Sequence, residues 1–345
     1  MIKIYTQHLY LKTEKISRFF PLLDEMIFHK ESIVHQSYCF VENSDDCDVL
    51  VLPLSIDYLL ETKEQSIIHY FKNESKRLNK PLWVFAGGDE PLSLVESNLF
   101  VFKVVDFKSK KDKNTIVMPV FIKDPYQHIF NIQIDYLAKT AQPIVGYVGH
   151  AKGGFIKYLK YIIVFFKHNF DIFTRKYYSN YADFFPSSHK RIKILNILKS
   201  SQLVATNFIF RDKYRAGAKS VEDRYRTTLE FFENIRQSHY TFCMRGGGNF
   251  SVRLYETLAM GRIPIQIDTD CSLPLDTIID WKEHCVFVPY NEAVNIVPML
   301  LDFHSQYNEE NFINLQKKNR IFWEDFLTRD RYFSVIHDLF IINEL

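Results

Sequence analysis

The chain has 345 residues, 47% of them hydrophobic and 24% charged, which predicts two α/β domains with a sizeable buried core. Its 43 Lys and Arg residues against 41 Asp and Glu residues give a formal net charge of +2, which argues against a protein that binds mainly nucleic-acid phosphates. The five cysteines form no Cys-x-x-Cys pair, and neither an apolar run of about 20 residues nor a signal-peptide core is present. We therefore expect no zinc ribbon, no disulfide scaffold and a cytoplasmic location.

The first 140 residues alternate short β-rich runs with helical stretches. This alternation is typical of βαβ units and predicts a parallel sheet. A helical segment is expected at residues 56–78, and the charged run at 108–114 is expected to be a solvated loop. Strands are expected at residues 2–6, 49–52, 82–86, 100–105 and 115–118.

A second alternating series begins at residue 143, with strands expected at 144–148, 203–206, 241–244 and 263–267 and helices at 222–236 and 251–260. After residue 291 the pattern is helical with few turn signals. We therefore predict three parts. They are a Rossmann-like N-terminal domain over residues 1–140, a Rossmann-like C-terminal domain over 141–325, and a C-terminal helix within 326–345 that packs back towards the N-terminal domain.

The densest chemical signal is an apolar strand that runs into three glycines, after which a helix opens with Ser251 in its first turn. Glycines allow the backbone to approach a ligand closely, and the free amides and positive dipole end of a helix favour a phosphate. The sequence therefore predicts a diphosphate site at Gly246, Gly247 and Gly248.

Charged side chains flank this turn. Arg245 and Arg253 can each form charge-assisted hydrogen bonds with phosphate oxygens, and Glu256 can accept hydrogen bonds from two ribose hydroxyls. The alternative is a tight turn that binds nothing, with Arg253 and Glu256 forming an ion pair on the helix surface.

The region from Arg245 onward resembles the exostosin family, glycosyltransferase family 47, in five ordered elements. These elements are Arg245-Gly246, Ser251-Val-Arg253-Leu-Tyr-Glu256, Ile263-Pro264-Ile265, Asp270-Cys-Ser-Leu273-Pro274-Leu275 and Ile279-Asp280-Trp281. Weaker similarities precede them at residues 47–53, at Trp83 with Gly87-Gly88-Asp89, and at 144–149. The chain departs from the family pattern at Glu90, where the family usually has His, at Leu275, where it has Phe, and at the turn 149–154, which lacks the family's Arg.

The resemblance implies a GT-B fold, in which two Rossmann-like domains face an inter-domain cleft. It also implies an inverting transfer from a nucleotide-sugar donor, commonly a UDP-sugar, to a hydroxyl of a glycan or lipid-linked glycan acceptor in polysaccharide or surface-glycan synthesis, with no obligatory metal. The donor would bind the second domain, where Arg245 to Glu256 and the loop at Asp270 contact the nucleotide. The acceptor would lie mainly against the first domain.

An inverting displacement needs a general base for the acceptor hydroxyl. Asp89 is the leading candidate because it follows an expected strand and two glycines, where open α/β sheets place ligands, and Glu90 is the runner-up. Capping of a following helix is an equal alternative for Asp89. His150 and Lys152, after the strand at 144–148, are candidates to face the cleft.

The sequence leaves three alternative functions. Asp268-Thr269-Asp270 follows an apolar strand and could hold a divalent cation, as in metal-dependent GT-A glycosyltransferases. A nucleotide-sugar or glycan-binding module without turnover is a second alternative. A dinucleotide-dependent oxidoreductase is disfavoured because the last glycine of Gly-x-Gly-x-x-Gly is missing.

The segment 155–178 mixes aromatic residues with Lys and Arg. It fits two structures: a helix on an anionic membrane surface, or an inter-domain helix whose aromatic face belongs to the core. We expect the second.

Overall fold

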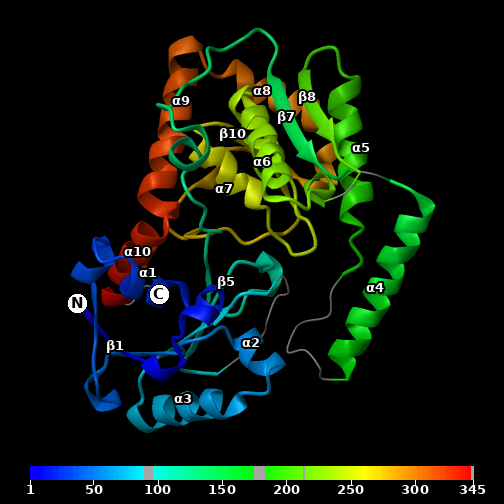
Figure 1. Ribbon diagram of the computed structural model, residues 1–345. Coiled ribbons are helices and arrows are strands. Elements are labelled where there is room, and N and C mark those ends of the chain that lie inside the picture. Colours follow the sequence, from blue (N-terminus) through cyan, green and yellow to red (C-terminus); the bar gives the residue numbers. More distant parts are fainter. Residues whose placement is uncertain (89–95, 152, 175–182, 213, 343–345) are drawn as a thin grey trace.

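A computed structural model describes residues 1–88, 96–151, 153–174, 183–212 and 214–342 (Figure 1). It contains two parallel sheets, a six-stranded sheet in the order β2-β1-β3-β4-β5-β6 and a five-stranded sheet in the order β11-β10-β9-β7-β8. The first sheet comes from the first 117 residues and the second from residues 144–289. This is the α/β class expected from the alternating pattern.

The first sheet forms where short apolar runs can be buried on both faces, as parallel strands require. All three residues of β3 are fully buried, and β4 is almost completely buried. The expected helix at 56–78 is two helices, because Lys63 takes a left-handed conformation (φ 60°) between them. The elements are β1 (Ile2–Tyr5), α1 (Pro21–Phe28), β2 (Tyr38–Phe40), β3 (Val49–Val51), α2 (Ile56–Glu61), α3 (Gln65–Leu78), β4 (Leu82–Ala86), β5 (Leu99–Lys103) and β6 (Thr115–Val117).

The second sheet has its own core, to which Tyr147, Phe242 and Ile265 contribute side chains that are completely buried. The connection between the two sheets is held against this sheet by His239 and His304, whose Nε2 atoms lie 2.9 and 2.8 Å from the carbonyl oxygens of Ala138 and Thr140. Its strands are β7 (Ile144–Gly149), β8 (Ala205–Phe210), β9 (Tyr240–Cys243), β10 (Ile263–Asp268) and β11 (Val286–Pro289). The helices of this half are α4 (Phe155–Phe173), α5 (Ser187–Ser200), α6 (Val221–Arg236), α7 (Val252–Ala259), α8 (Ile296–Ser305) and α9 (Glu309–Phe322).

The last described helix, α10 (Arg329–Ile341), packs against the first sheet. Figure 1 shows α9 and α10 running from the second half of the molecule to the first. Phe333 of α10 lies in the core of the first sheet, 6.0 Å from the Phe20 ring and 6.3 Å from the Phe102 ring. The Tyr38 hydroxyl donates a 2.7 Å hydrogen bond to the Phe333 carbonyl, which fixes the helix against β2.

The position of α4 corrects one expectation. In Figure 1 this helix stands apart from both sheets. Asp171 is its one residue that is fully buried, whereas Phe155, Phe166 and Phe173 are 77%, 66% and 72% exposed. The interpretation that the aromatic face of residues 155–178 belongs to the core is therefore wrong for the described part of that segment, because the apolar face of the helix points outward.

Candidate functional site

The glycine turn connects the end of β9 to the start of α7. Gly246 and Gly247 are exposed, and a Cβ on either would meet no atom of the described residues within 4 Å. Neither has a positive φ, so neither backbone conformation nor packing against the described residues requires glycine here. Ser251 is the N-cap of α7 and its side chain makes no capping hydrogen bond. The turn and the first amides of α7 therefore leave room and donors for an anion.

Arg245 and Arg253 flank this turn in the sequence. The Arg245 guanidinium lies 4.7 Å from the centre of the Phe185 ring and 5.3 Å from that of Phe107, and its Nη2 donates to the Gly247 carbonyl at 3.0 Å. The Arg253 guanidinium lies 4.7 Å from the Tyr147 ring and donates to the carbonyl of Val148 at 2.9 Å. Aromatic rings and carbonyl oxygens therefore orient both side chains without neutralising them.

A third arginine, Arg191 of α5, joins them and was not predicted from the sequence. It donates to the carbonyl of His150 at 2.9 Å and to that of Arg245 at 2.7 Å. Among the described residues, no carboxylate lies within 4 Å of Arg191, Arg245 or Arg253, and the buried Nε atom of each has no hydrogen-bond partner.

Burial lowers the pKa of Arg191. It also lowers the pKa of Arg245 to about 10, so the Arg245 guanidinium remains charged at neutral pH. Three cations close to a helix N-terminus, with no carboxylate at ion-pair distance in the described chain, form a concentrated positive field. We call these three residues the arginine cluster. A field of this kind is suited to an anionic ligand with more than one negative charge.

Asn249 fixes the turn to two other segments. Its side-chain nitrogen donates to the carbonyl oxygens of Asp106 at 3.1 Å and Asp270 at 2.9 Å, while its oxygen accepts a bond from Thr269 at 2.8 Å. Asp106 belongs to the first half of the chain, and Phe107 forms an antiparallel bridge with Cys271. The glycine turn is therefore positioned by the loop after β5 and the loop after β10.

The charged run after β5 is exposed at residues 108–110, as expected of a solvated loop, but it also makes contacts that the sequence did not predict. Lys108 forms an ion pair with Asp268 at 3.1 Å, and the Ser109 hydroxyl donates to the Asp270 carboxylate at 2.5 Å. This loop therefore contacts the second half of the chain. Both carboxylates of the Asp268-Thr269-Asp270 motif are occupied by the first half, and a metal ion at this pair would have to displace them. Asp270 also has a left-handed backbone (φ 65°).

The other predicted donor residues lie around the same turn. Ser251 is 8% exposed, and Glu256 is half-buried in the second turn of α7. His150 is half-buried behind the arginine cluster. Its Nδ1 lies 2.9 Å from the Arg211 carbonyl, which assigns the proton to that nitrogen, and its Nε2 accepts a hydrogen bond from Lys157 of α4. Both ring nitrogens of His150 are therefore already occupied.

On the first sheet, an acid that the sequence did not single out shapes the end of β4. The Asp57 carboxylate accepts hydrogen bonds from the amides of Gly87 at 2.7 Å and Gly88 at 3.1 Å, and burial raises its pKa. The chain thereby leaves β4 at its carboxyl end in a fixed direction. Asp89 and Glu90, the candidate bases, and Lys152 lie outside the described residues.

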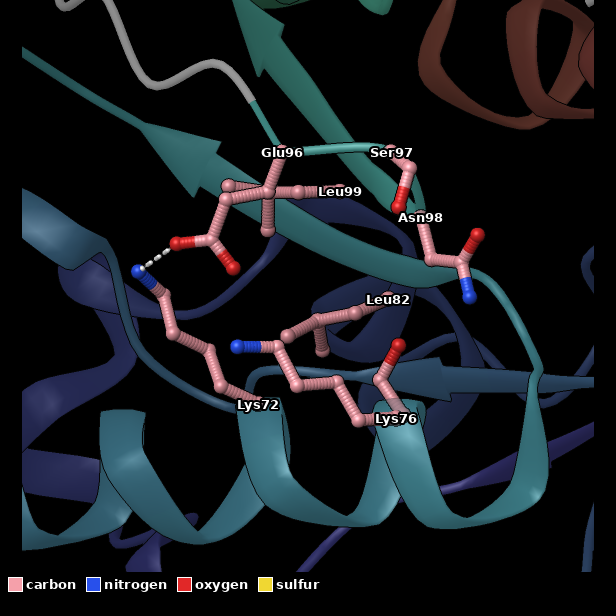
Figure 2. Close-up of a pocket in the computed structure, with 8 residues that line it drawn as sticks. Lys72, Lys76, Leu82, Glu96, Ser97, Asn98 and Leu99 are labelled. Carbon is pink, nitrogen blue, oxygen red and sulfur yellow. Dashed lines mark hydrogen bonds and ion pairs between the residues drawn. The ribbon is translucent and has the colours of Figure 1, made fainter.

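A surface pocket lies elsewhere, on the first half of the molecule (Figure 2). It is lined by α3 and by the starts of β4 and β5, and the ion pair of Lys72 with Glu96, at 2.5 Å, crosses it. The starts of parallel strands lie opposite the edge at which open α/β sheets bind ligands. This pocket is therefore not part of the site at the glycine turn.

The two parallel Rossmann-like sheets meet through loops at the carboxyl ends of their strands, and this arrangement is the GT-B fold of glycosyltransferases. The exostosin GT47 domain matches residues 21–302, so the chain belongs to the exostosin GT47 family and is a glycosyltransferase. The predicted family, fold class and enzyme class are confirmed.

The chain is also similar to several solved structures. No curated protein matches it. A mutant of S. aureus TarM in complex with fondaparinux, alpha-GlcNAc-glycerol and UDP is 11% identical with a TM-score of 0.39, over 85% of this chain and 55% of that one, so the chain spans about half of its length. A glycosyltransferase from Rickettsia africae ESF-5 is 11% identical with a TM-score of 0.41, over 97% of each chain. An alpha1,3-fucosyltransferase is 13% identical with a TM-score of 0.33, over 94% of this chain and 90% of that one.

Proposed function

We propose that this glycosyltransferase moves a sugar from a UDP-sugar to a hydroxyl group of a glycan acceptor, with inversion at the anomeric carbon. The observation that carries the proposal is the arginine cluster at the glycine turn. A nucleotide diphosphate carries adjacent negative charges, and the cluster offers oriented cations at a helix N-terminus. The choice of uridine and the inversion rest on the family resemblance alone.

In this proposal, different residues bind the diphosphate and the ribose of the donor. Arg245, Arg253 and the first amides of α7, including the backbone at Ser251, bind the two phosphates. Gly246 and Gly247 leave the space that the diphosphate occupies. Glu256 accepts hydrogen bonds from the ribose hydroxyls. Asp270 contributes through its loop, which Asn249 fastens to the glycine turn, rather than through its carboxylate, which Ser109 already binds.

The chemical step is a direct displacement. The acceptor oxygen forms a bond to the anomeric carbon, the bond from that carbon to the diphosphate oxygen breaks, and the electron pair leaves with UDP. The proposed base, Asp89, takes the acceptor proton, with Glu90 as the alternative base. The position of Gly88, the residue before Asp89 in the sequence, supports this assignment, because Gly88 lies just beyond the carboxyl end of β4, the edge at which open α/β sheets bind ligands. The arginine cluster stabilises the charge that develops on the leaving group.

The same cluster supplies the positive charge that a divalent cation provides in metal-dependent enzymes. We therefore expect the release of UDP from the donor to continue in excess EDTA. A complete loss of UDP release that Mn²⁺ restores would support a metal site at Asp268 and Asp270 instead.

The proposal is tested by calorimetric titration of UDP, GDP and CMP, followed by measurement of UDP release from UDP-sugars. We expect UDP to bind most tightly. Asp89→Asn should lower the turnover rate by about 100-fold or more, with UDP affinity within a few-fold of the wild type. Glu90→Gln tests the alternative base and should retain most turnover.

Three results would contradict the proposal. If no nucleotide binds, the glycine turn is not a donor-binding site. Binding of UDP without release from any UDP-sugar would indicate a binding module. Full turnover in Asp89→Asn with loss in Glu90→Gln would move the base to Glu90. The anomeric configuration of the product, determined by NMR, tests inversion directly.

A further inference from the structure

Helix α4 has an inner face that attaches it to the rest of the protein. The Tyr158 and Phe165 rings lie 5.6 and 5.5 Å from the Phe184 ring, and the Tyr161 hydroxyl lies 3.1 Å from the Ser188 hydroxyl. Lys157, on the same side, donates to His150 behind the arginine cluster. These contacts fix which side of the helix faces inward.

The opposite face of α4 is apolar and exposed. Its residues follow one another at spacings of three and four, which places them in one stripe along the helix. Their side chains are 41–74% exposed, so most of their apolar surface is left uncovered by the described chain. We call this stripe the outer face; it consists of Ile156, Leu159, Ile163, Phe166, Phe170 and Phe173.

An apolar stripe of this length on a solvent-exposed helix needs a partner. Nineteen residues at 1.5 Å each give a helix of about 28 Å, nearly all of which the outer face follows. Within the described residues, the chain has no helix that is long and apolar enough to cross a bilayer. Because the outer face runs along the side of the helix, its partner binds along that side.

The charges beside the stripe identify this partner. Lys160 and Lys167 are exposed and lie seven residues apart at its edge, while the single acid of α4, Asp171, is buried. A second copy of the chain packed on the stripe would bring these lysines near their equivalents, with no exposed carboxylate from α4 to pair with them. Anionic lipid headgroups would instead neutralise both lysines while the apolar side chains enter the membrane interface.

We propose that the outer face of α4 docks on an anionic membrane surface, with the helix axis parallel to the membrane. Phe166 and Phe170 insert at the boundary between headgroups and acyl chains, and Lys160 and Lys167 contact lipid phosphates. The inner face then holds the arginine cluster close to the membrane through Lys157 and His150. This inference does not require the proposed reaction, because it concerns binding in the absence of donor and acceptor.

The test is co-sedimentation of the full chain with vesicles of phosphatidylcholine alone or with about 30% phosphatidylglycerol, at low and high salt and without nucleotide. We expect binding to the anionic vesicles that weakens at high salt. The double variants Phe166→Ser/Phe170→Ser and Lys160→Glu/Lys167→Glu should each bind at least about 10-fold more weakly, since both apolar insertion and charge contribute. Circular dichroism confirms that each variant is folded.

A matched control changes the same charge elsewhere. Lys30 and Lys219 are exposed and lie outside α4, so Lys30→Glu/Lys219→Glu should bind as the wild type does. Three outcomes overturn the proposal: no binding of the wild type to anionic vesicles, equal binding by the Lys160→Glu/Lys167→Glu variant and the control, or no vesicle binding together with a dimer in sedimentation velocity that Phe166→Ser/Phe170→Ser dissociates. The last outcome would assign the outer face to self-association.

Discussion

Replacement of Arg245 by methionine separates the two roles that a half-buried arginine can have. If Arg245 stabilises the fold, the variant should unfold more easily. If it is present to bind a diphosphate, the protein without ligand should be as stable as before or more stable, because burial already disfavours the charge and no described carboxylate lies at ion-pair distance. We expect the second result, with weaker UDP binding.

The size of the effect follows from the contacts. Methionine retains apolar packing against Phe107 and Phe185 but removes the charge and the hydrogen-bond donors. A hydrogen bond to a charged group is worth about 1.5–3 kcal/mol, so UDP should bind about 10-fold to 100-fold more weakly. At a UDP concentration of about 100 times the wild-type Kd, ligand stabilisation should fall from about 2.7 kcal/mol to about 1.4 kcal/mol for a roughly 10-fold loss of affinity.

Calorimetry gives the affinity, and urea unfolding with and without UDP gives the two stabilities. Arg224 of α6 is exposed, so Arg224→Met serves as the control and should change neither quantity. Arg245 does not bind the diphosphate if Arg245→Met binds UDP as tightly as the wild type does. Arg245 is a stabilising residue of the fold if the variant without ligand loses several kcal/mol of stability.

Three further changes test other residues. Glu256→Ala should weaken UDP binding in calorimetry with little change in melting temperature. An unchanged affinity would exclude the proposed contact between Glu256 and the ribose. Asp57→Ala should lower the free energy of unfolding by about 1–3 kcal/mol in urea, because the amides of Gly87 and Gly88 lose their acceptor, whereas Asp57→Asn should recover most of it. Burial lowers the pKa of His239 from 6.5 to about 4, so the unfolded chain takes up a proton first as the pH falls. The contribution of His239 to the free energy of unfolding is therefore present above about pH 6.5 and is lost towards about pH 4. The urea midpoint should fall less between about pH 7.5 and about pH 5 in His239→Gln than in the wild type. An equal fall in both proteins would contradict this.

The sequence predicted the central strands well because they are apolar and have clear ends. Residues 82–86 lie between Pro81 and Gly87, and the structure has β4 over the same residues. It did not predict β2 or β11, each of which is one edge strand of its sheet. These strands have only three and four residues, and such short runs show little sequence pattern.

The site was predicted where its residues are close in sequence and missed where the fold assembles it. Arg245 to Glu256 stand in one segment, whereas Arg191 lies 54 residues before its contact with Arg245, and Asp57 lies 30 residues before Gly87. A single arginine or aspartate on an otherwise ordinary helix has no local signal of such a role. The sequence showed that aromatic residues recur along α4, but this spacing cannot show which face of the helix points outward. Nothing in the described chain tests the roles of Asp89 and Glu90, which remain predictions.

The packing of α10 on the first sheet has a consequence for synthesis of the protein. The Tyr38 hydroxyl and the Phe333 carbonyl are separated by 295 residues, and Phe333 shares a core with Phe20 and Trp83. During translation, part of the core of the first sheet stays uncovered until residue 333 has left the ribosome. Such distant contacts slow folding and prolong the exposure of apolar surface. The second half of the molecule, whose sheet core draws on residues 145–315, can fold before its neighbour is complete.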